Sequence, residues 1–410
     1  MVHQTMSTSK TSAPSASSKI RPMKRLLWHV FVVAIVGTLA SCGSVPLQDG
    51  GPSPAPLPAP ATTAPATSAG LPPDTAPLPP PIQQARSRWT PVRWAELPGF
   101  ADDALFEAWN AWLKSCERPG PTFAPLCSEV RRLSIGTAGE QRQWMVEKLQ
   151  PYRVEPLQGA SDGLLTGYYE PLLDATRQPT AASNAPLYRP PAGLGSRKPW
   201  YTRQEMDTLP EARAALRGRE IAYLADPLDA LVLQIQGSGR LRITEPDGSQ
   251  RIVRLAFAAT NDQPYRSVGG WLLSQGAIRD ASWPGIKAWT LQNPQRVNEM
   301  LWSNPRMVFF REEPLSELDA AFGPRGAQGV ALTPGRSIAV DPGSIPYGTP
   351  VWLASSGPVT SLQRLVMAQD TGSAITGAVR ADYYTGTGDQ AAELAGRLKQ
   401  PLRLWVLWPK

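Results

Sequence analysis

The chain has almost no histidine. Of its 410 residues only His3 and His29 are histidines, and both lie in or before an apolar N-terminal segment. If that segment is removed from the mature protein, no imidazole remains for a Ser-His-Asp or Cys-His nucleophile system or for a histidine-ligated metal site. The acid and base groups that are left for catalysis are therefore carboxylates.

A strong charge imbalance is also lacking. The chain has 41 Lys and Arg against 34 Asp and Glu, a formal net charge of +7, and the basic residues are scattered. This distribution does not favour a nucleic-acid partner. The small excess of positive charge suits an anionic polymer as partner, and simple solubility explains the excess equally well.

Because the sequence has no P-loop and no dinucleotide fingerprint, we expect no nucleotide cofactor, and we also expect no metal.

The N-terminal region has the pattern of a targeting segment. From Met23, two basic residues precede an apolar stretch too short to span a bilayer comfortably, and small residues lead to Cys42. This pattern predicts a signal peptide over residues 1–42 instead of a transmembrane helix. The residues before Met23 are rich in Ser and Thr, so the start codon is either Met1 or Met23.

Leu39-Ala40-Ser41-Cys42 resembles a bacterial lipoprotein cleavage box, in which Cys42 becomes the lipidated first residue of the mature protein. A plain membrane anchor is the alternative. No aspartate follows Cys42 directly, so the resemblance implies an outer-membrane lipoprotein that faces the periplasm.

An oxidising periplasm favours a disulfide between Cys116 and Cys127, and two free buried cysteines are the alternative. A catalytic cysteine is not expected without a histidine to activate it.

Residues 43–88 are dominated by Pro, Ala, Ser and Thr. Such a segment cannot bury enough apolar surface to fold, and it is expected to be an extended, disordered tether. At about 3.1 Å per residue, it would hold a domain on the order of 100 Å from a membrane. That reach suits a large, fixed substrate.

The remaining chain, from residue 89 to 410, is long enough for a large core or two domains. An apolar stripe after Asp102-Asp103 recurs at helical spacing and predicts an amphipathic helix whose aromatic residues belong to the core. This apolar stripe consists of Leu105, Ala108, Trp109, Trp112 and Leu113. Two more helices are expected over residues 141–149 and 294–302.

Beyond Gly163, short apolar stretches alternate with Gly, Pro, Asp and Asn turns, which is typical of a β-barrel or β-sandwich. Asp247-Gly248 between two such stretches predicts a hairpin. The expected strand regions are 164–173, 230–244, 251–260, 337–354, 364–370 and 402–408.

Asp370 and Asp382 lie on either side of a Gly-rich loop, directly after one of these apolar stretches. Two carboxyl groups that a turn brings near each other can have their pKa values pushed apart, so that one stays protonated at neutral pH. A protonated acid in a cleft suggests glycosidic chemistry. Asp-Thr-Gly and Asp-Pro-Gly are also ordinary turn formers, so a structural role is the alternative for each aspartate.

Six stretches together resemble the membrane-bound lytic murein transglycosylase A family, including its C-terminal three-aspartate (3D) domain. They occur in the family's order and cover nearly all of the chain from residue 89 onward. They are GYYEP at 167–171, QIQGSGRL at 234–241, NDQPYRSVG at 261–269, NPRMVFF at 304–310, RSIAVDPGSIPYGTPV at 336–351 and RLVMAQDTGSAITGAVRADYY at 364–384.

The resemblance implies a mainly β fold with peripheral helices. A double-psi β-barrel domain would be built from residues 89–171 and 305–410, with the 3D region at about 330–410. Residues 172–304 would form a smaller inserted β domain, and the groove between the two would hold the glycan. The family cleaves the β-1,4 bond between N-acetylmuramic acid and N-acetylglucosamine without water and leaves a 1,6-anhydromuramoyl end.

The motifs also suggest roles for individual residues. By its position in the motif, Asp382 matches the residue that is both the catalytic acid and the base of the family, and Asp370 matches the aspartate that neighbours it. Asp341 is the third aspartate of the 3D domain, and we expect its role to be mainly structural. Glu170 is the main rival acid. The groove walls are expected to contain Thr166, Tyr168, Tyr169, Glu170, Gln234, Gln236, Gly237 and Ser238, with a role in barrel bends or core packing as the alternative.

Two other functions remain open from the sequence. A peptidoglycan hydrolase would use Asp370 or Glu170 to activate water and would leave a reducing end. A non-catalytic lipoprotein would use the same barrel to bind the wall. In all three cases the expected partners are peptidoglycan strands and, through the N-terminal lipid, a membrane. The sequence identifies no protein partner in a wall-synthesis complex.

Overall fold

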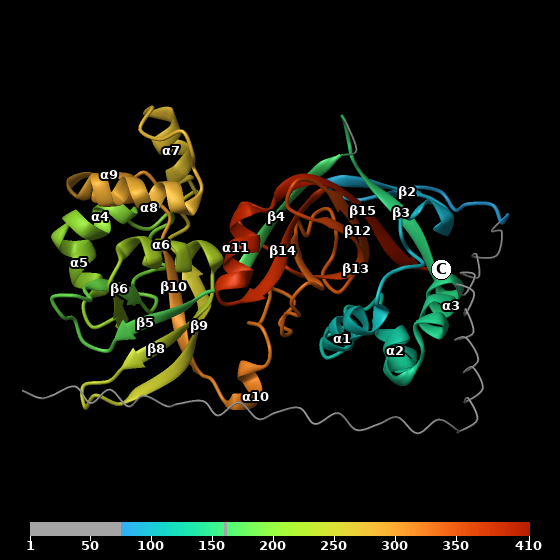
Figure 1. Ribbon diagram of the computed structural model, residues 1–410, viewed down its shortest axis with the longest axis horizontal. Helices are drawn as coiled ribbons and strands as arrows, with labels where there is room; N and C mark the ends of the chain where they lie inside the picture. The colour runs from blue at the N-terminus through green and yellow to red at the C-terminus, as the bar shows by residue number, and fades with distance from the viewer. Residues whose placement is uncertain (1–74, 160–161) are drawn as a thin grey trace, which may run out of the picture. The chain divides into compact units, whose positions relative to one another are not determined.

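Two β-sheets form the framework of the part of the chain that the computed structural model describes, residues 75–159 and 162–410 (Figure 1). The first sheet consists of β1 (Ile82–Gln83), β2 (Ser87–Pro91), β3 (Leu149–Pro156), β4 (Gly163–Glu170), β11 (Ser337–Val340), β12 (Pro350–Ser356), β13 (Ser361–Asp370), β14 (Arg380–Thr387) and β15 (Lys399–Pro409). The second consists of β5 (Leu172–Thr176), β6 (Ala185–Tyr188), β7 (Glu220–Leu224), β8 (Gly239–Thr244), β9 (Gln250–Thr260) and β10 (Val308–Pro314).

The first sheet closes on itself as a barrel. Its strands run β15, β12, β13, β11, β14 and β4, and β4 pairs back onto β15. The pairs β11–β13 and β14–β4 are parallel, whereas β12 lies antiparallel to both of its neighbours. Closure pairs the backbone groups of strands that would otherwise be exposed edges. The mainly β prediction is confirmed, and the double-psi connection stays a prediction.

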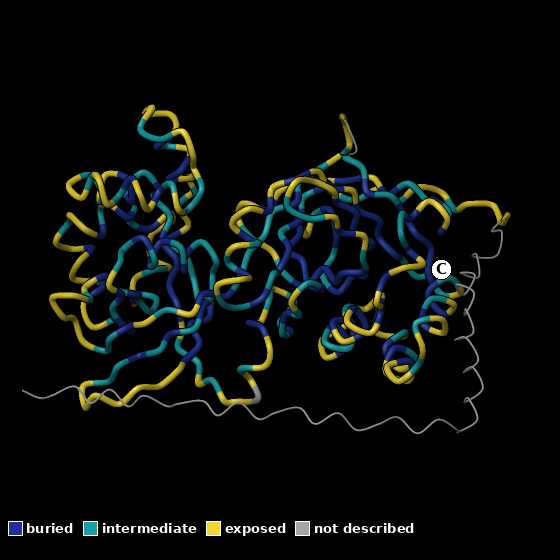
Figure 2. The backbone as a smooth tube through the Cα atoms, in the orientation of Figure 1, coloured by how far each residue is buried: buried dark blue, intermediate teal, exposed yellow. Residues whose placement is uncertain are grey.

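Helices lie around both sheets. Figure 1 shows α11 beside β4 and β14, and Figure 2 shows that the buried backbone follows the strands. The helices are α1 (Leu105–Ser115), α2 (Cys127–Arg132), α3 (Ala138–Lys148), α4 (Arg203–Thr208), α5 (Pro210–Leu216), α6 (Pro227–Gln236), α7 (Val268–Ser274), α8 (Trp283–Gln292), α9 (Val297–Trp302), α10 (Glu317–Ala320) and α11 (Asp389–Arg397). Among the described residues, no helix is long and apolar enough to cross a membrane.

The strand pairing extends beyond the domain limits that were expected from the sequence. The second sheet extends to Pro314 because β10 pairs with β9, ten residues beyond the expected return at residue 304. Strand pairing begins at Ile82, inside the predicted tether. The division into domains remains a proposal. The predicted signal peptide, Cys42 and the tether as far as residue 74 lie outside the described residues.

The expected strand at 230–244 is wrong in its first half, because Pro227–Gln236 is helix α6. The Asp226 carboxylate accepts a hydrogen bond from the Leu228 N–H, Pro227 occupies the first turn, and Gly237 ends the helix with φ of +81°. These are ordinary helix start and stop signals. A short apolar run fits a buried helix as well as a buried strand, so periodicity alone gave the wrong element.

Other elements agree with the sequence. The helix after Asp102-Asp103 is α1, and its aromatic stripe is core, since Trp109 and Trp112 pack with Trp352 of β12. The Asp247-Gly248 hairpin joins β8 to β9, with Gly248 at φ of +84°. The expected helix at 294–302 is a short 3-10 turn followed by α9.

The predicted disulfide between Cys116 and Cys127 is confirmed. Cys116 follows the last residue of α1 and Cys127 begins α2, so the bridge joins the ends of two consecutive helices. Both cysteines are buried in the same core cluster as Trp112.

Glu170, at the end of β4, ties the barrel to the second sheet. Its side chain is fully buried. One carboxylate oxygen accepts a hydrogen bond from Arg254 of β9 at 2.6 Å, and the other accepts from Arg240 of β8 at 2.8 Å and from Thr387 at 3.2 Å. Both oxygens are therefore used in holding the two sheets together.

We expect Glu170→Gln to lower the free energy of unfolding by about 3–5 kcal/mol, because it leaves two buried guanidinium groups without their carboxylate. Urea unfolding followed by circular dichroism measures this. The control is Asp174→Asn, which removes an exposed partner of Arg242 and should cost about 1 kcal/mol or less. Equal losses in the two variants would contradict the structural role of Glu170.

Candidate active site

Asp382 is positioned by the parallel pairing of β14 with β4, which sets it directly opposite Thr166. The Thr166 hydroxyl donates a hydrogen bond to Asp382 Oδ1. Arg380 Nη2 in turn donates to Thr166 Oγ1 at 2.8 Å. Because a guanidinium can only donate, the threonine hydroxyl is left to give its own proton to the aspartate.

This chain of donors determines which carboxyl oxygen carries a proton. Oδ1 of Asp382 already accepts from Thr166, so a proton on the carboxyl belongs on Oδ2. Burial raises the pKa of Asp382, while the hydrogen bond from Thr166 and the charge of Arg380 lower it, and the net shift is upward. Asp382 is thus a carboxyl group that holds its proton to higher pH than an exposed aspartate does.

Asp370 lies at the end of β13 and both of its oxygens are occupied. Oδ1 accepts from the backbone N–H groups of Ala327 and Thr371, each at 2.9 Å, and Oδ2 accepts from the Tyr168 hydroxyl at 2.9 Å. Burial and, as the smallest contribution, the nearby charge of Asp382 raise the pKa of Asp370 to about 6 against these three hydrogen bonds. The two carboxyl groups therefore interact electrostatically.

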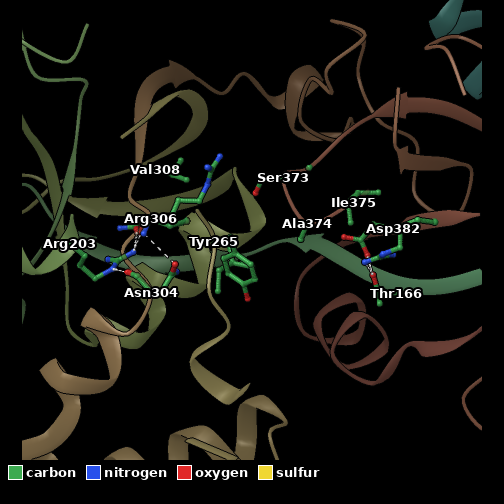
Figure 3. Close-up of a pocket in the computed structure, with 14 residues that line it drawn as sticks. Thr166, Arg203, Tyr265, Asn304, Arg306, Val308, Ser373, Ala374, Ile375 and Asp382 are labelled. Atoms are coloured by element: carbon green, nitrogen blue, oxygen red, sulfur yellow. Dashed lines mark hydrogen bonds between the residues drawn. The ribbon is translucent and has the colours of Figure 1, made fainter. Parts of the chain in front are cut away.

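Two adjoining cavities contain one of these aspartates each, and they share Arg306, Gly372 and Ser373 as lining residues. The first cavity has a volume of about 270 Å³, and Figure 3 shows Thr166 and Asp382 together in its wall. The second has a volume of about 840 Å³ and includes Asp370. Among the described residues, Asp382 is the sole acid that lines the first cavity, and Asp370 is the sole acid that lines the second.

Most of the predicted groove residues line one of the two cavities. Thr166 and Gln234 line the first, and Tyr168, Gln236, Gly237 and Ser238 line the second. Tyr169 lines neither, and its backbone N–H donates to Gln236 Oε1 at 3.0 Å, which joins β4 to the end of α6.

Glu170 and Asp341 do not line either cavity. Asp341 is buried and holds loops of the barrel, because its carboxylate accepts from the backbone N–H groups of Gly343 and Gly377 and pairs with Arg86. These contacts favour the structural role that was expected for Asp341. Asp389, the next acid after Asp382 in the chain, begins α11.

The sequence reasoning did not identify the polar residues that complete the first cavity, which are Arg203, Tyr265, Asn304, Arg306 and Arg380. Asn304 and Arg306 belong to NPRMVFF, Tyr265 belongs to NDQPYRSVG, and Arg380 is two residues from Asp382, so the motifs contained a signal for these four. Arg203 comes from a separate segment that only the fold brings to the cavity. Within residues 75–159 and 162–410 no group of acids, cysteines or histidines is arranged to hold a metal ion.

Comparison with known proteins places this geometry in a family. A family model described as the MltA specific insert domain matches residues 164–311, and the 3D domain model matches residues 336–408. The solved structure of the lytic transglycosylase LtgG of Burkholderia pseudomallei is 44% identical, with a TM-score of 0.55, and the match covers 80% of this chain and 97% of that one.

Two curated relatives carry the name membrane-bound lytic murein transglycosylase A. The Vibrio cholerae protein is 31% identical over 256 residues, which are 60% of this chain and 65%, slightly under two thirds, of that protein. The Escherichia coli K12 protein is 30% identical over 285 residues, which are 67% of this chain and 73% of that protein. With both domain models matched in order, the chain belongs to the membrane-bound lytic murein transglycosylase A family.

Proposed function

We propose that the protein is a lytic transglycosylase that cleaves the β-1,4 bond between N-acetylmuramic acid and N-acetylglucosamine in peptidoglycan and leaves 1,6-anhydromuramoyl ends. The names of its relatives support the reaction class. The observation that carries the proposal is Asp382, a carboxyl group with a raised pKa that is fixed by Thr166 in the wall of a cavity.

In this mechanism one carboxyl group acts twice. Asp382 Oδ2 first gives its proton to the glycosidic oxygen as the bond to C1 of the muramoyl sugar breaks. The carboxylate then takes the proton of the sugar's own C6 hydroxyl as that oxygen attacks C1. The aspartate ends protonated, no water is consumed, and the nucleophile comes from the substrate. The raised pKa of Asp382 favours the protonated form that the first step needs.

Asp370 is assigned a supporting part. Its three hydrogen bonds use both oxygens, which leaves it poorly placed to activate a water or attack a sugar. The charge of Asp382 raises the pKa of Asp370. Because coupling between two charges is reciprocal, a charge on Asp370 also disfavours the ionisation of Asp382. Asp370 therefore adjusts the acid and fixes Tyr168, which lines the second cavity.

A hydrolase with two carboxylates is the second candidate, because the pKa of Asp370 is also raised, to about 6. It would need an Asp370 oxygen directed at a water molecule near C1. The occupation of both oxygens counts against it.

The proposed location is the outer membrane, with the protein anchored through lipid on Cys42 and facing the periplasm. The lipoprotein-like Leu39-Ala40-Ser41-Cys42 supports the anchor, and the names of the curated relatives support membrane association. In this arrangement the Pro-rich segment after Cys42 spans the distance to the peptidoglycan.

Asp382→Asn should reduce the release of soluble fragments from purified peptidoglycan at least about 100-fold, because it removes the only proton donor proposed for the leaving oxygen. Binding to peptidoglycan should be kept, since asparagine has nearly the same shape. The matched control is Asp389→Asn, an exposed position at the start of α11 that should leave release unchanged. Release by Asp382→Asn at the rate of the unsubstituted chain would refute the assignment of the acid.

The pH dependence tests the role of Asp370. Activity should fall as the pH rises through the pKa of Asp382, because the acid loses its proton. Asp370, with a pKa of about 6, becomes charged as the pH rises. Because its coupling to Asp382 is reciprocal, this charge disfavours the loss of the Asp382 proton. Asp370→Asn should therefore move the alkaline limb of the rate profile to lower pH. A lower rate with an unmoved limb would mean that Asp370 only shapes its loop.

A further inference from the structure

Three arginines line the first cavity, and among the described residues none of Arg203, Arg306 and Arg380 has a carboxylate within ion-pairing distance. Arg380 interacts electrostatically with the acid Asp382, whereas Arg203 and Arg306 interact only through space with Asp207 and Asp262. Most other arginines that lie partly or fully inside the protein do have one, such as Arg177 and Arg336. A guanidinium that is withdrawn from water without an opposite charge is costly, so its retention in a cavity calls for an explanation.

Arg203, the first residue of α4, is only 6% exposed. Its Nε donates to the Asn304 carbonyl at 3.1 Å, and its Nη2 donates to Gln234 Oε1 and the Arg306 carbonyl, each at 2.6 Å. The remaining nitrogen, Nη1, has only the sulfur of Met307, at 3.7 Å. Because a thioether is a weak acceptor, Nη1 keeps donor capacity for a ligand.

Arg306 lies at the junction of the two cavities, and it lines both. Its Nη1 donates to the Gln263 carbonyl at 3.0 Å, which leaves the other guanidinium N–H groups for a second partner. Burial lowers the pKa of Arg203 to about 10 and that of Arg306 below its usual value, so both would gain from a neighbouring anion. Figure 3 shows Arg203, Asn304 and Arg306 together at one end of the cavity and Asp382 at the other.

We propose that Arg203 and Arg306 form an anion subsite that binds a carboxylate on a muramoyl residue of the glycan near Asp382. The inference rests on the proposed function, because it names the part of the substrate that the cavity recognises. The N-acetylglucosamine rings carry no charge. The negatively charged groups of the strand are the lactyl carboxylate of a bare muramoyl residue and the carboxylates of a stem peptide. A guanidinium binds either through strong, oriented hydrogen bonds.

The subsite would make the enzyme specific for muramoyl-containing strands over uncharged chitin-like strands. The acetamido groups of the two kinds of strand are the same, so shape and neutral hydrogen bonds discriminate between them weakly. A buried cation that is satisfied only by the carboxylate discriminates more strongly, since a strand that lacks the carboxylate leaves the cation unpaired.

The test is a binding measurement with the full chain in detergent, carrying Asp382→Asn so that bound strands are not cleaved. The probes are chitotetraose, a bare tetrasaccharide of alternating N-acetylglucosamine and N-acetylmuramic acid, and the same tetrasaccharide with stem peptides. Arg306→Gln should raise the Kd for at least one muramoyl probe about tenfold or more and leave that for chitotetraose unchanged. Arg306→Lys, which keeps the charge, should recover part of the loss.

The control is Arg242→Gln, a partly exposed arginine of β8 that lines neither cavity and should change none of the three Kd values. A loss confined to the bare probe identifies the lactyl carboxylate as the ligand, and a loss confined to the peptide-bearing probe identifies the peptide. An equal loss for chitotetraose, or no loss for either muramoyl probe, would overturn the subsite. Because binding is measured without turnover, failure of the proposed reaction would not change these outcomes.

Discussion

The parallel pairing of β4 with β14 is the constraint on which the rest of the site depends. This pairing places Thr166 of β4 opposite Asp382 of β14, and two residues further along it places Tyr168 opposite Tyr384. The Tyr168 hydroxyl donates a hydrogen bond to Asp370. Strand β4 also closes the barrel by pairing with β15. It ends at Glu170, whose carboxylate binds arginines of the second sheet. A shift of β4 by one residue would turn each of these side chains to the other face of the barrel.

The electrostatics of the site balance two opposing effects. Burial favours the neutral form of Asp382, whereas Arg380 and the Thr166 hydroxyl favour its ionised form. An acid that gives up a proton and then takes one back must be able to adopt both the protonated and the ionised form. The opposing effects of burial on one side and of Arg380 and Thr166 on the other reduce the difference in free energy between these forms. The arginines of the first cavity add positive charge near the acid. An anionic substrate group bound by Arg203 and Arg306 would offset that charge and help Asp382 to keep its proton until the glycosidic bond breaks.

The sequence predicted several of the strands, the helix at α1 and the disulfide, because each has a local signal: apolar runs between turns, helical spacing or a pair of cysteines. A motif also singled out Asp370 and Asp382, whose roles stay a proposal. The prediction failed at residues 230–236, where an apolar run fits a strand and a helix equally well. The partners of Asp382 could not be assigned in advance, since Thr166 is more than two hundred residues away in the chain. Arg203 has no pattern around it that separates it from a surface arginine. Its burial and its lack of an ion pair become visible only when α4, α6 and the segment before β10 are packed together.

The central claim is that a single carboxyl group cleaves the glycan without water. The most direct test is mass spectrometry of the fragments that the detergent-purified full chain releases from peptidoglycan. Cleavage through the substrate's own C6 hydroxyl predicts muramoyl ends that are one water lighter than hydrolysed ends and that resist reduction by borohydride. Fragments with reducible, full-mass ends would contradict the account and would require a second carboxylate to activate water.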